Sequence, residues 1–116
     1  MKMKKSEIEA KRKEIVALLL QKGWKPNLEY IIKNYSWFHN PPKINYETGE
    51  VGGIGGTYNY GQFIISSDGT MAATIKSTVI ILHDSKRSYC KVFSAKYADL
   101  EIKKDGLQHS KIKIMF

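Results

Sequence analysis

Cysteine, cofactor motifs and long apolar runs are scarce or missing in this sequence, and each absence excludes a class of protein. Cys90 is the single cysteine, so no disulfide can form within the chain, which fits a reducing compartment. The longest apolar run, Ile15 to Leu20, is far shorter than the ~20 residues that a membrane-spanning helix needs. No Cys/His pair has zinc-site spacing, and no motif indicates a cofactor. We therefore expect a cytoplasmic protein without membrane contact, metal or cofactor.

Arginine is also rare, although the chain is strongly basic. The sequence has 19 basic and 11 acidic residues and a formal net charge of +8. Arg12 and Arg87 are the two arginines, and all other basic residues are lysines, which act as point charges and lack the bidentate fork of arginine. Such an excess favours an anionic partner, namely a nucleic acid, a nucleotide or a ribonucleoprotein surface.

Two segments near the N-terminus have the spacing of amphipathic helices. The first spans Ser6 to Lys22, with Ser6 and Glu9 predicted as a capping box and Gly23 as the C-terminal stop. The second begins at Pro26-Asn27 and ends before Pro41. We expect the core-facing stripes to be Ile8, Ile15, Leu18 and Leu19 in the first helix, and Leu28, Ile31, Ile32 and Tyr35 in the second.

From residue 43 onward the hydrophobic pattern has the period of two that is typical of strands. About six strands follow, and Asp68-Gly69 and Asp105-Gly106 are strong hairpin signals between them. The apolar run Thr78 to His83 is predicted as the central strand. The sequence thus predicts one α+β domain over residues 1–116, in which two N-terminal helices pack on one face of an antiparallel meander sheet of five or six strands. Its expected parts are a flexible basic arm (1–5), a helical part (6–38) and a sheet part (43–116).

A glycine- and tyrosine-rich segment lies early in the sheet part. Five of the nine glycines fall between Val51 and Gly61, with a spacing that matches neither a dinucleotide fingerprint nor a Walker loop. Two interpretations stay open: a bulged connection into a strand, or a mobile functional loop. The aromatics in this segment either pack across strands or stack on unpaired bases. The candidate binding residues here are Gly55, Gly56, Tyr58 and Tyr60.

Two basic clusters are candidates for contact with a polyanion. The N-terminal cluster is half-neutralised by Glu7, Glu9 and Glu14 and fits a solvated helix face equally well; its basic residues are Lys2, Lys4, Lys5, Lys11, Arg12 and Lys13. The C-terminal cluster has fewer acids and lies on the predicted outward face of the closing strands. We therefore expect an anionic partner to contact a lysine-rich sheet face formed by Lys91, Lys96, Lys103, Lys104, Lys111 and Lys113.

Two alternatives to a non-enzymatic binding protein stay open. Helices followed by a sheet, with Ile54-Gly55-Gly56 at the sheet entrance, resemble small microbial ribonucleases and RelE-type toxins. The resemblance covers topology alone and implies a small endoribonuclease, for which His39, His83 and His109 would be the acid–base candidates. The arginine-rich active site of that group has no counterpart here, so no catalytic residue is assigned. The other alternative is a phage or mobile-element inhibitor of a host defence complex, acting by protein–protein interaction. An exposed closing strand could also pair with a second copy of the chain.

Overall fold

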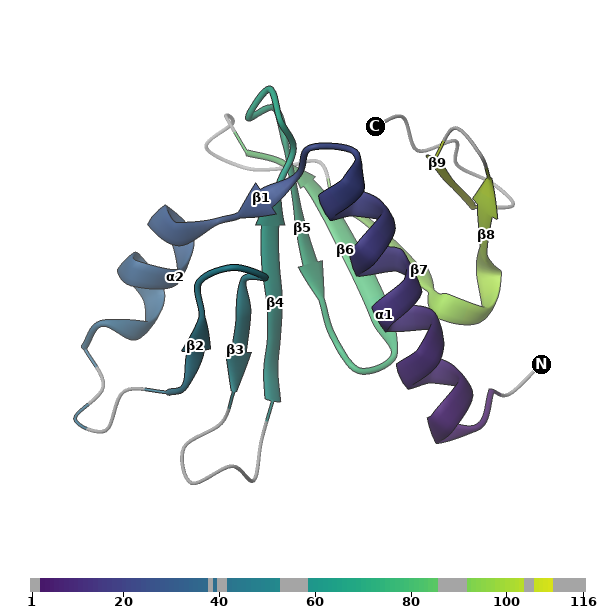
Figure 1. Cartoon of the computed structure of the whole chain (residues 1–116), viewed down its shortest axis with the longest axis horizontal. Helices are drawn as coiled ribbons and strands as arrows, with labels where there is room; N and C mark the ends of the chain where they lie inside the picture. The colour runs from purple at the N-terminus through teal and green to yellow at the C-terminus, as the bar shows by residue number, and fades with distance from the viewer. Residues whose placement is uncertain are drawn as a thin grey trace.

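Two α-helices near the N-terminus and an antiparallel sheet make up most of the fold (Figure 1). The computed structural model describes residues 3–37, 39, 42–52, 59–85, 92–103 and 106–109. Within these ranges, neither helix combines the length and the apolar character that crossing a bilayer requires. In chain order the elements are α1 (Lys5–Gln21), β1 (Lys25–Pro26), α2 (Leu28–Tyr35), β2 (Ile44–Asn45), β3 (Glu50–Gly52), β4 (Asn59–Ile65), β5 (Met71–Ile75), β6 (Val79–Asp84), β7 (Phe93–Lys96), the 3-10 turn η2 (Tyr97–Asp99), β8 (Leu100–Lys103) and β9 (Gly106–His109).

Helix α1 ends as the sequence predicts but begins differently. Gly23 has φ +96°, and the Trp24 amide donates to the Leu19 carbonyl at 3.0 Å, so a left-handed glycine closes the helix. At the other end the Lys4 amide donates to the Glu7 carboxylate at 3.4 Å. The predicted capping box at Ser6 and Glu9 is therefore wrong. The N-cap residue is Lys4, two residues before Ser6, and Glu7 takes the place in the capping box that was expected for Glu9.

The strands form one antiparallel sheet and a separate hairpin. The main sheet has the order β2-β3-β4-β5-β6-β7, with β1 also paired to β4, while β8 and β9 pair only with each other among the described residues. The α+β class and the antiparallel pairing are confirmed. The prediction that β6 is central is wrong, since it lies second from the β7 edge. The closing strands do not extend the main sheet, because η2 turns the chain away after β7 (Figure 1).

The predicted Asp68-Gly69 hairpin between β4 and β5 is confirmed. Gly69 has φ +76°, and the Asp68 carboxylate accepts from the Thr70 hydroxyl and the Ser66 hydroxyl, each at 2.7 Å. These hydrogen bonds, with those from Thr70 the strongest, lower the pKa of Asp68 to about 2. An Asx-type turn of this kind explains why the local sequence alone was sufficient to locate the hairpin.

The two helices lie on opposite faces of the main sheet, so the expected packing on one face is not confirmed. Ile15, Val16 and Leu19 of α1 share a buried core cluster with Ile64 of β4, whereas Ile31 of α2 is buried against Phe63. Successive strand residues point to opposite faces, and Phe63 and Ile64 are neighbours. The short strand β1 explains the difference: it pairs along the edge of β4 and carries the chain past that edge between the helices.

Helix α2 buries a narrower stripe than the sequence predicts. Ile31 is buried and Tyr35 half-buried, while the side chains of Leu28 and Ile32 are 41% and 56% exposed. The ring of Tyr30 lies instead against Phe63, with ring centroids 4.9 Å apart. This two-turn helix packs on a small cluster from β2, β3 and β4, namely Ile44, Val51 and Phe63, and buries only one row of side chains there.

A cleft between helix α1 and the end of the sheet

The inward face of α1 changes character along the helix. Its C-terminal half buries Ile15, Val16 and Leu19, all with side chains at most 7% exposed. At the same helical spacing of three or four residues, this face continues toward the N-terminus as Arg12, then Ile8 and Glu9, then Lys5. Charged side chains therefore occupy positions where the packing of the C-terminal half would place apolar ones.

A cleft of about 470 Å³ opens beside this charged half of the helix. One wall is α1 together with Met3, two residues before the helix; the opposite wall is the β5–β6 turn and the backbone of β4. Figure 1 shows the N-terminal half of α1 running beside that turn, beyond the part of the helix that covers the sheet. The described lining residues are Met3, Lys5, Ile8, Glu9, Arg12, Gly61, Ser77 and Thr78.

The β4 wall of the cleft is a glycine in an unusual conformation. Gly61 has φ +118°, and a Cβ at this position would lie 2.6 Å from the carbonyl oxygen of Ile75. The pairing of β3 with β4 also shifts register between Val51 and Gly52, directly opposite this stretch. Bulges of this kind re-aim the chain at the end of a strand and are frequent next to functional sites. A register shift is thus present where the glycine- and tyrosine-rich segment joins the sheet, while residues 53–58 of that segment lie outside the described residues.

The opposite wall is held in place by Tyr97. This residue is 1% exposed, and its hydroxyl donates to the backbone carbonyl of Lys76, the first residue of the β5–β6 turn. The Lys76 amide in turn donates to the Val79 carbonyl at 2.9 Å and closes the turn that carries Ser77 and Thr78. Burial raises the pKa of Tyr97 to about 12, and the positive charge of Arg12 opposes this shift only in part.

The electrostatics of the lining are mixed, with an excess of positive charge. Lys5 and Arg12 are the two cations of the lining and Glu9 is its single described anion. The Glu9 carboxylate also lies 3.7 Å from the Lys13 ammonium on the adjacent turn, a solvent-exposed pair that contributes little to stability. Arg12 is half-buried, so its guanidinium interacts in a lower effective dielectric than a fully exposed lysine would. Cations opposite two hydroxyl groups can hold an anion by charge-assisted hydrogen bonds.

Little of the lysine-rich face that the sequence predicts falls within the described structure. Lys96 is exposed on β7, one residue after the core-packed Ala95, so it points away from the face that α1 covers. Lys103 lies on β8 in the separate hairpin, and its side chain, like that of Tyr60 on β4, is outside the described part. Other predicted residues lie wholly outside the described ranges: Gly55, Gly56, Tyr58, Lys91, Lys104, Lys111 and Lys113.

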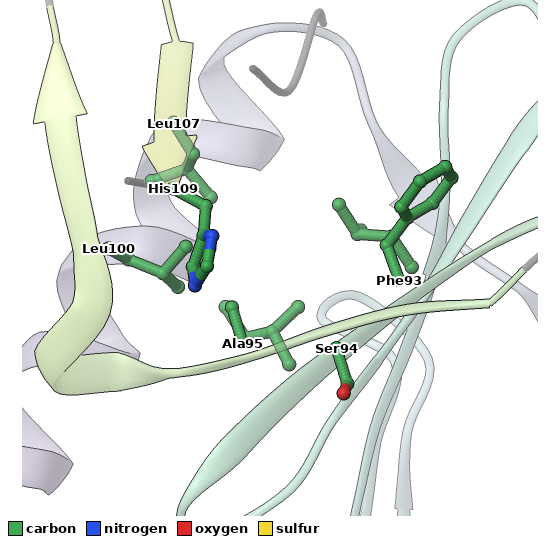
Figure 2. A pocket seen from close by; sticks show the side chains of 8 residues that line it. Phe93, Ser94, Ala95, Leu100, Leu107 and His109 are labelled. Atoms are coloured by element: carbon green, nitrogen blue, oxygen red, sulfur yellow. The ribbon is translucent and has the colours of Figure 1, made fainter. Parts of the chain in front are cut away.

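Two of the three candidate histidines, His83 and His109, do not come together as a ribonuclease mechanism would require. Figure 2 shows His109 in a crevice of about 10 Å³ between β7 and the β8–β9 hairpin, together with Leu100 and Leu107. That volume holds at most about one water molecule, so the crevice is a packing defect and not a substrate site. Leu82 lines the same crevice, whereas His83 follows it on β6 and points to the other face of the sheet. His83 and His109 are therefore separated by the sheet. Burial lowers the pKa of His83, which keeps its imidazole neutral near pH 7.

The sequence contained one signal for the cleft that the charge analysis did not use. Arg12 lies four residues after Ile8 and three before Ile15, so it interrupts the apolar stripe itself. Charge alone gives no reason to separate Lys5 and Arg12 from the other cations of the N-terminal cluster. Ser77 and Thr78 carry no local pattern, because only the packing of α1 against the sheet brings them opposite the helix.

Comparison with known proteins does not extend these observations. No protein-family model matches the chain, and neither curated proteins nor solved structures show a significant similarity to it.

Proposed function

We propose that this chain is a non-enzymatic binding protein whose cleft between α1 and the β5–β6 turn holds a phosphate group of an anionic partner, with nucleic acid as the preferred class. The observation that carries this proposal is the placement of Lys5 and Arg12 on the core-facing stripe of α1, opposite Ser77 and Thr78. Guanidinium and ammonium groups beside hydroxyl donors are the usual protein partners of phosphate oxygens.

The energetic cost of this arrangement supports a role in binding. A half-buried arginine loses hydration, and an apolar residue at the same position of the stripe would extend the core. Sequences depart from consistent patterning mainly where function requires it. Nearby, the register shift opposite Gly61 lies in the first part of β4, where the glycine- and tyrosine-rich segment joins the sheet, so Tyr58 and Tyr60 are candidates to contact the same ligand.

The lysine-rich face remains a second, auxiliary part of the proposal. Lys96 lies on the sheet face opposite to the cleft, so a long polyanion would have to cross a sheet edge to reach both surfaces. We assign the specific contact to the cleft and only unspecific attraction to the lysines of the C-terminal part. A cytoplasmic partner suits a chain with a single cysteine.

The test is the salt dependence of binding to a labelled single-stranded oligonucleotide, measured by fluorescence anisotropy. The one phosphate held by Lys5 and Arg12 should contribute about −0.7 to the slope of log affinity against log salt, because each neutralised phosphate of a single strand contributes about this much. Arg12→Gln should reduce the magnitude of the slope by about 0.7.

Lys33→Gln is the matched control, since Lys33 is an exposed cation on α2 and outside the cleft lining. It removes the same unit of charge and should leave the slope near the wild-type value. The proposal is wrong if the wild-type protein does not bind at low salt, or if both substitutions change the slope equally.

A further inference from the structure

We infer that the cleft is built for a single unstacked nucleotide, with the base against Met3 and Ile8 and its phosphate at Lys5 and Arg12. This inference rests on the proposed function and specifies the ligand of the same site.

The lining includes an apolar part, formed by Met3 and Ile8, that a base can contact. Met3 and Ile8 are half-buried and pack against the core cluster that contains Ile15 and Leu19. Their outer surfaces face a cleft that also contains charged groups. A thioether beside an aliphatic side chain offers a polarisable apolar surface, which is the kind of contact that a planar aromatic base prefers.

The size of the cleft fits a ligand of nucleotide size. Its volume of about 470 Å³ lies within the range of about 300–1,000 Å³ that is usual for small-molecule sites. A cleft between one helix and one turn cannot admit stacked, paired bases, so a nucleotide must leave its stack to enter. The site should therefore prefer single-stranded to duplex nucleic acid.

The carboxylate of Glu9 favours a nucleotide over a ligand that consists only of phosphates. It lines the same cleft as Lys5 and Arg12, so a ligand that consists only of phosphates would place negative charge beside it. A nucleotide places one phosphate at the cations and offers hydrogen-bond donors, such as amino groups of the base or ribose hydroxyls, to the carboxylate. The hydroxyls of Ser77 and Thr78 can donate or accept at the remaining polar edges.

The experiment is a competition assay in which unlabelled ligands displace a labelled single strand from the full chain. The competitors are the same single strand, its duplex, inorganic polyphosphate of matched charge and the mononucleotide. We expect the single strand to compete at least about tenfold better than polyphosphate or duplex, since burial of one base against apolar side chains accounts for about this ratio.

Three substitutions in the cleft, with one control outside it, test whether the preference for the single strand arises in the cleft. Ile8→Ala should weaken single-strand binding about tenfold, through loss of apolar contact with the base, and leave polyphosphate binding unchanged. Ile32→Ala, the same change at an exposed position of α2, should affect neither. Thr78→Val should weaken the binding of the single-stranded oligonucleotide by about threefold through loss of one hydrogen bond. Thr78 is an exposed turn residue, so the change carries little risk for folding. Glu9→Gln should strengthen polyphosphate binding and so reduce the ratio of single-strand affinity to polyphosphate affinity.

The outcomes separate this inference from the function on which it rests. Equal competition by single strand, duplex and polyphosphate, with no selective effect of Ile8→Ala, would overturn the nucleotide inference and leave anion binding in place. Absence of all binding would overturn both. A mononucleotide that competes as well as the strand identifies the ligand as a free nucleotide, and one that competes poorly identifies it as a strand; either result supports the inference.

Discussion

The two halves of α1 show how one helical face can serve two purposes. In the C-terminal half, Ile15 and Leu19 are fully buried against the sheet. In the N-terminal half, Lys5 and Arg12 lie on the same stripe but line an open cleft. The helix is continuous from Lys5 to Gln21, so its backbone does not cause the difference. The comparison teaches that the departure from apolar patterning, and not the total charge, locates the candidate site.

The largest expected effect is a loss of stability on substitution in the C-terminal half of α1, where the inward face is buried. Ile15→Ala should lower the free energy of unfolding by about 2–5 kcal/mol, because it removes a fully buried side chain and leaves a cavity. Ile8→Ala in the cleft half should cost clearly less, since Ile8 already borders open space. Urea denaturation of the two variants measures the difference. Equal losses would show that Ile8 belongs to the core and not to a binding surface.

The next effect concerns the strained wall of the cleft. Gly61→Ala should destabilise the protein by about 1–3 kcal/mol for two reasons. Alanine rarely adopts the positive φ of this position, and its Cβ would lie 2.6 Å from the Ile75 carbonyl oxygen. Gly69→Ala is the control: it has a similar positive φ but no neighbouring atom within 4 Å, and should cost only about 1 kcal/mol. Thermal unfolding compares them. If Gly69→Ala is as harmful as Gly61→Ala, close approach at the cleft wall is not a constraint.

The smallest expected effect is on the opposite wall. Tyr97→Phe removes the donor to the Lys76 carbonyl and should cost about 1 kcal/mol of stability. It should also weaken ligand binding slightly, because the turn with Ser77 and Thr78 loses its anchor.

The Tyr97 hydroxyl adds a pH dependence with a defined sign. Its pKa is raised from 10 to about 12 in the folded protein, so folding favours the neutral phenol. The corresponding stability is fully present below pH 10 and is lost as the pH rises toward 12. The free energy of unfolding, measured across this pH range, should decline with rising pH in the wild type but not in Tyr97→Phe. The same decline in both proteins would assign it to other groups.

The parts of the fold with local chemistry were predictable from the sequence. Gly23 stops α1 and Asp68-Gly69 forms a hairpin because each sets its own backbone geometry. The opposite placement of the helices was not predictable, since it depends on the two-residue strand β1, which is too short to show any periodicity. The burial of Ile31 without Ile32 likewise depends on how much sheet lies beneath α2.

The candidate site was predictable only in part. The net charge suggests cations as functional candidates, and the lysines of the C-terminal part are the most numerous of them, but most of these lie outside the described residues. Arg12 could have been singled out as a charge within an apolar stripe. Ser77, Thr78 and the supporting Tyr97 are far from α1 in sequence, so only tertiary packing relates them to it.

The most direct test of the central claim is a titration of the isotopically labelled protein with a single-stranded oligonucleotide, followed through backbone amide NMR signals. The account predicts the largest shifts at the cleft, in residues 3–12, at Gly61 and at Ser77 and Thr78, with little change in residues 15–19 or in α2. Shifts that are confined to β7 and the neighbourhood of Lys96, with none along the N-terminal half of α1, would contradict it.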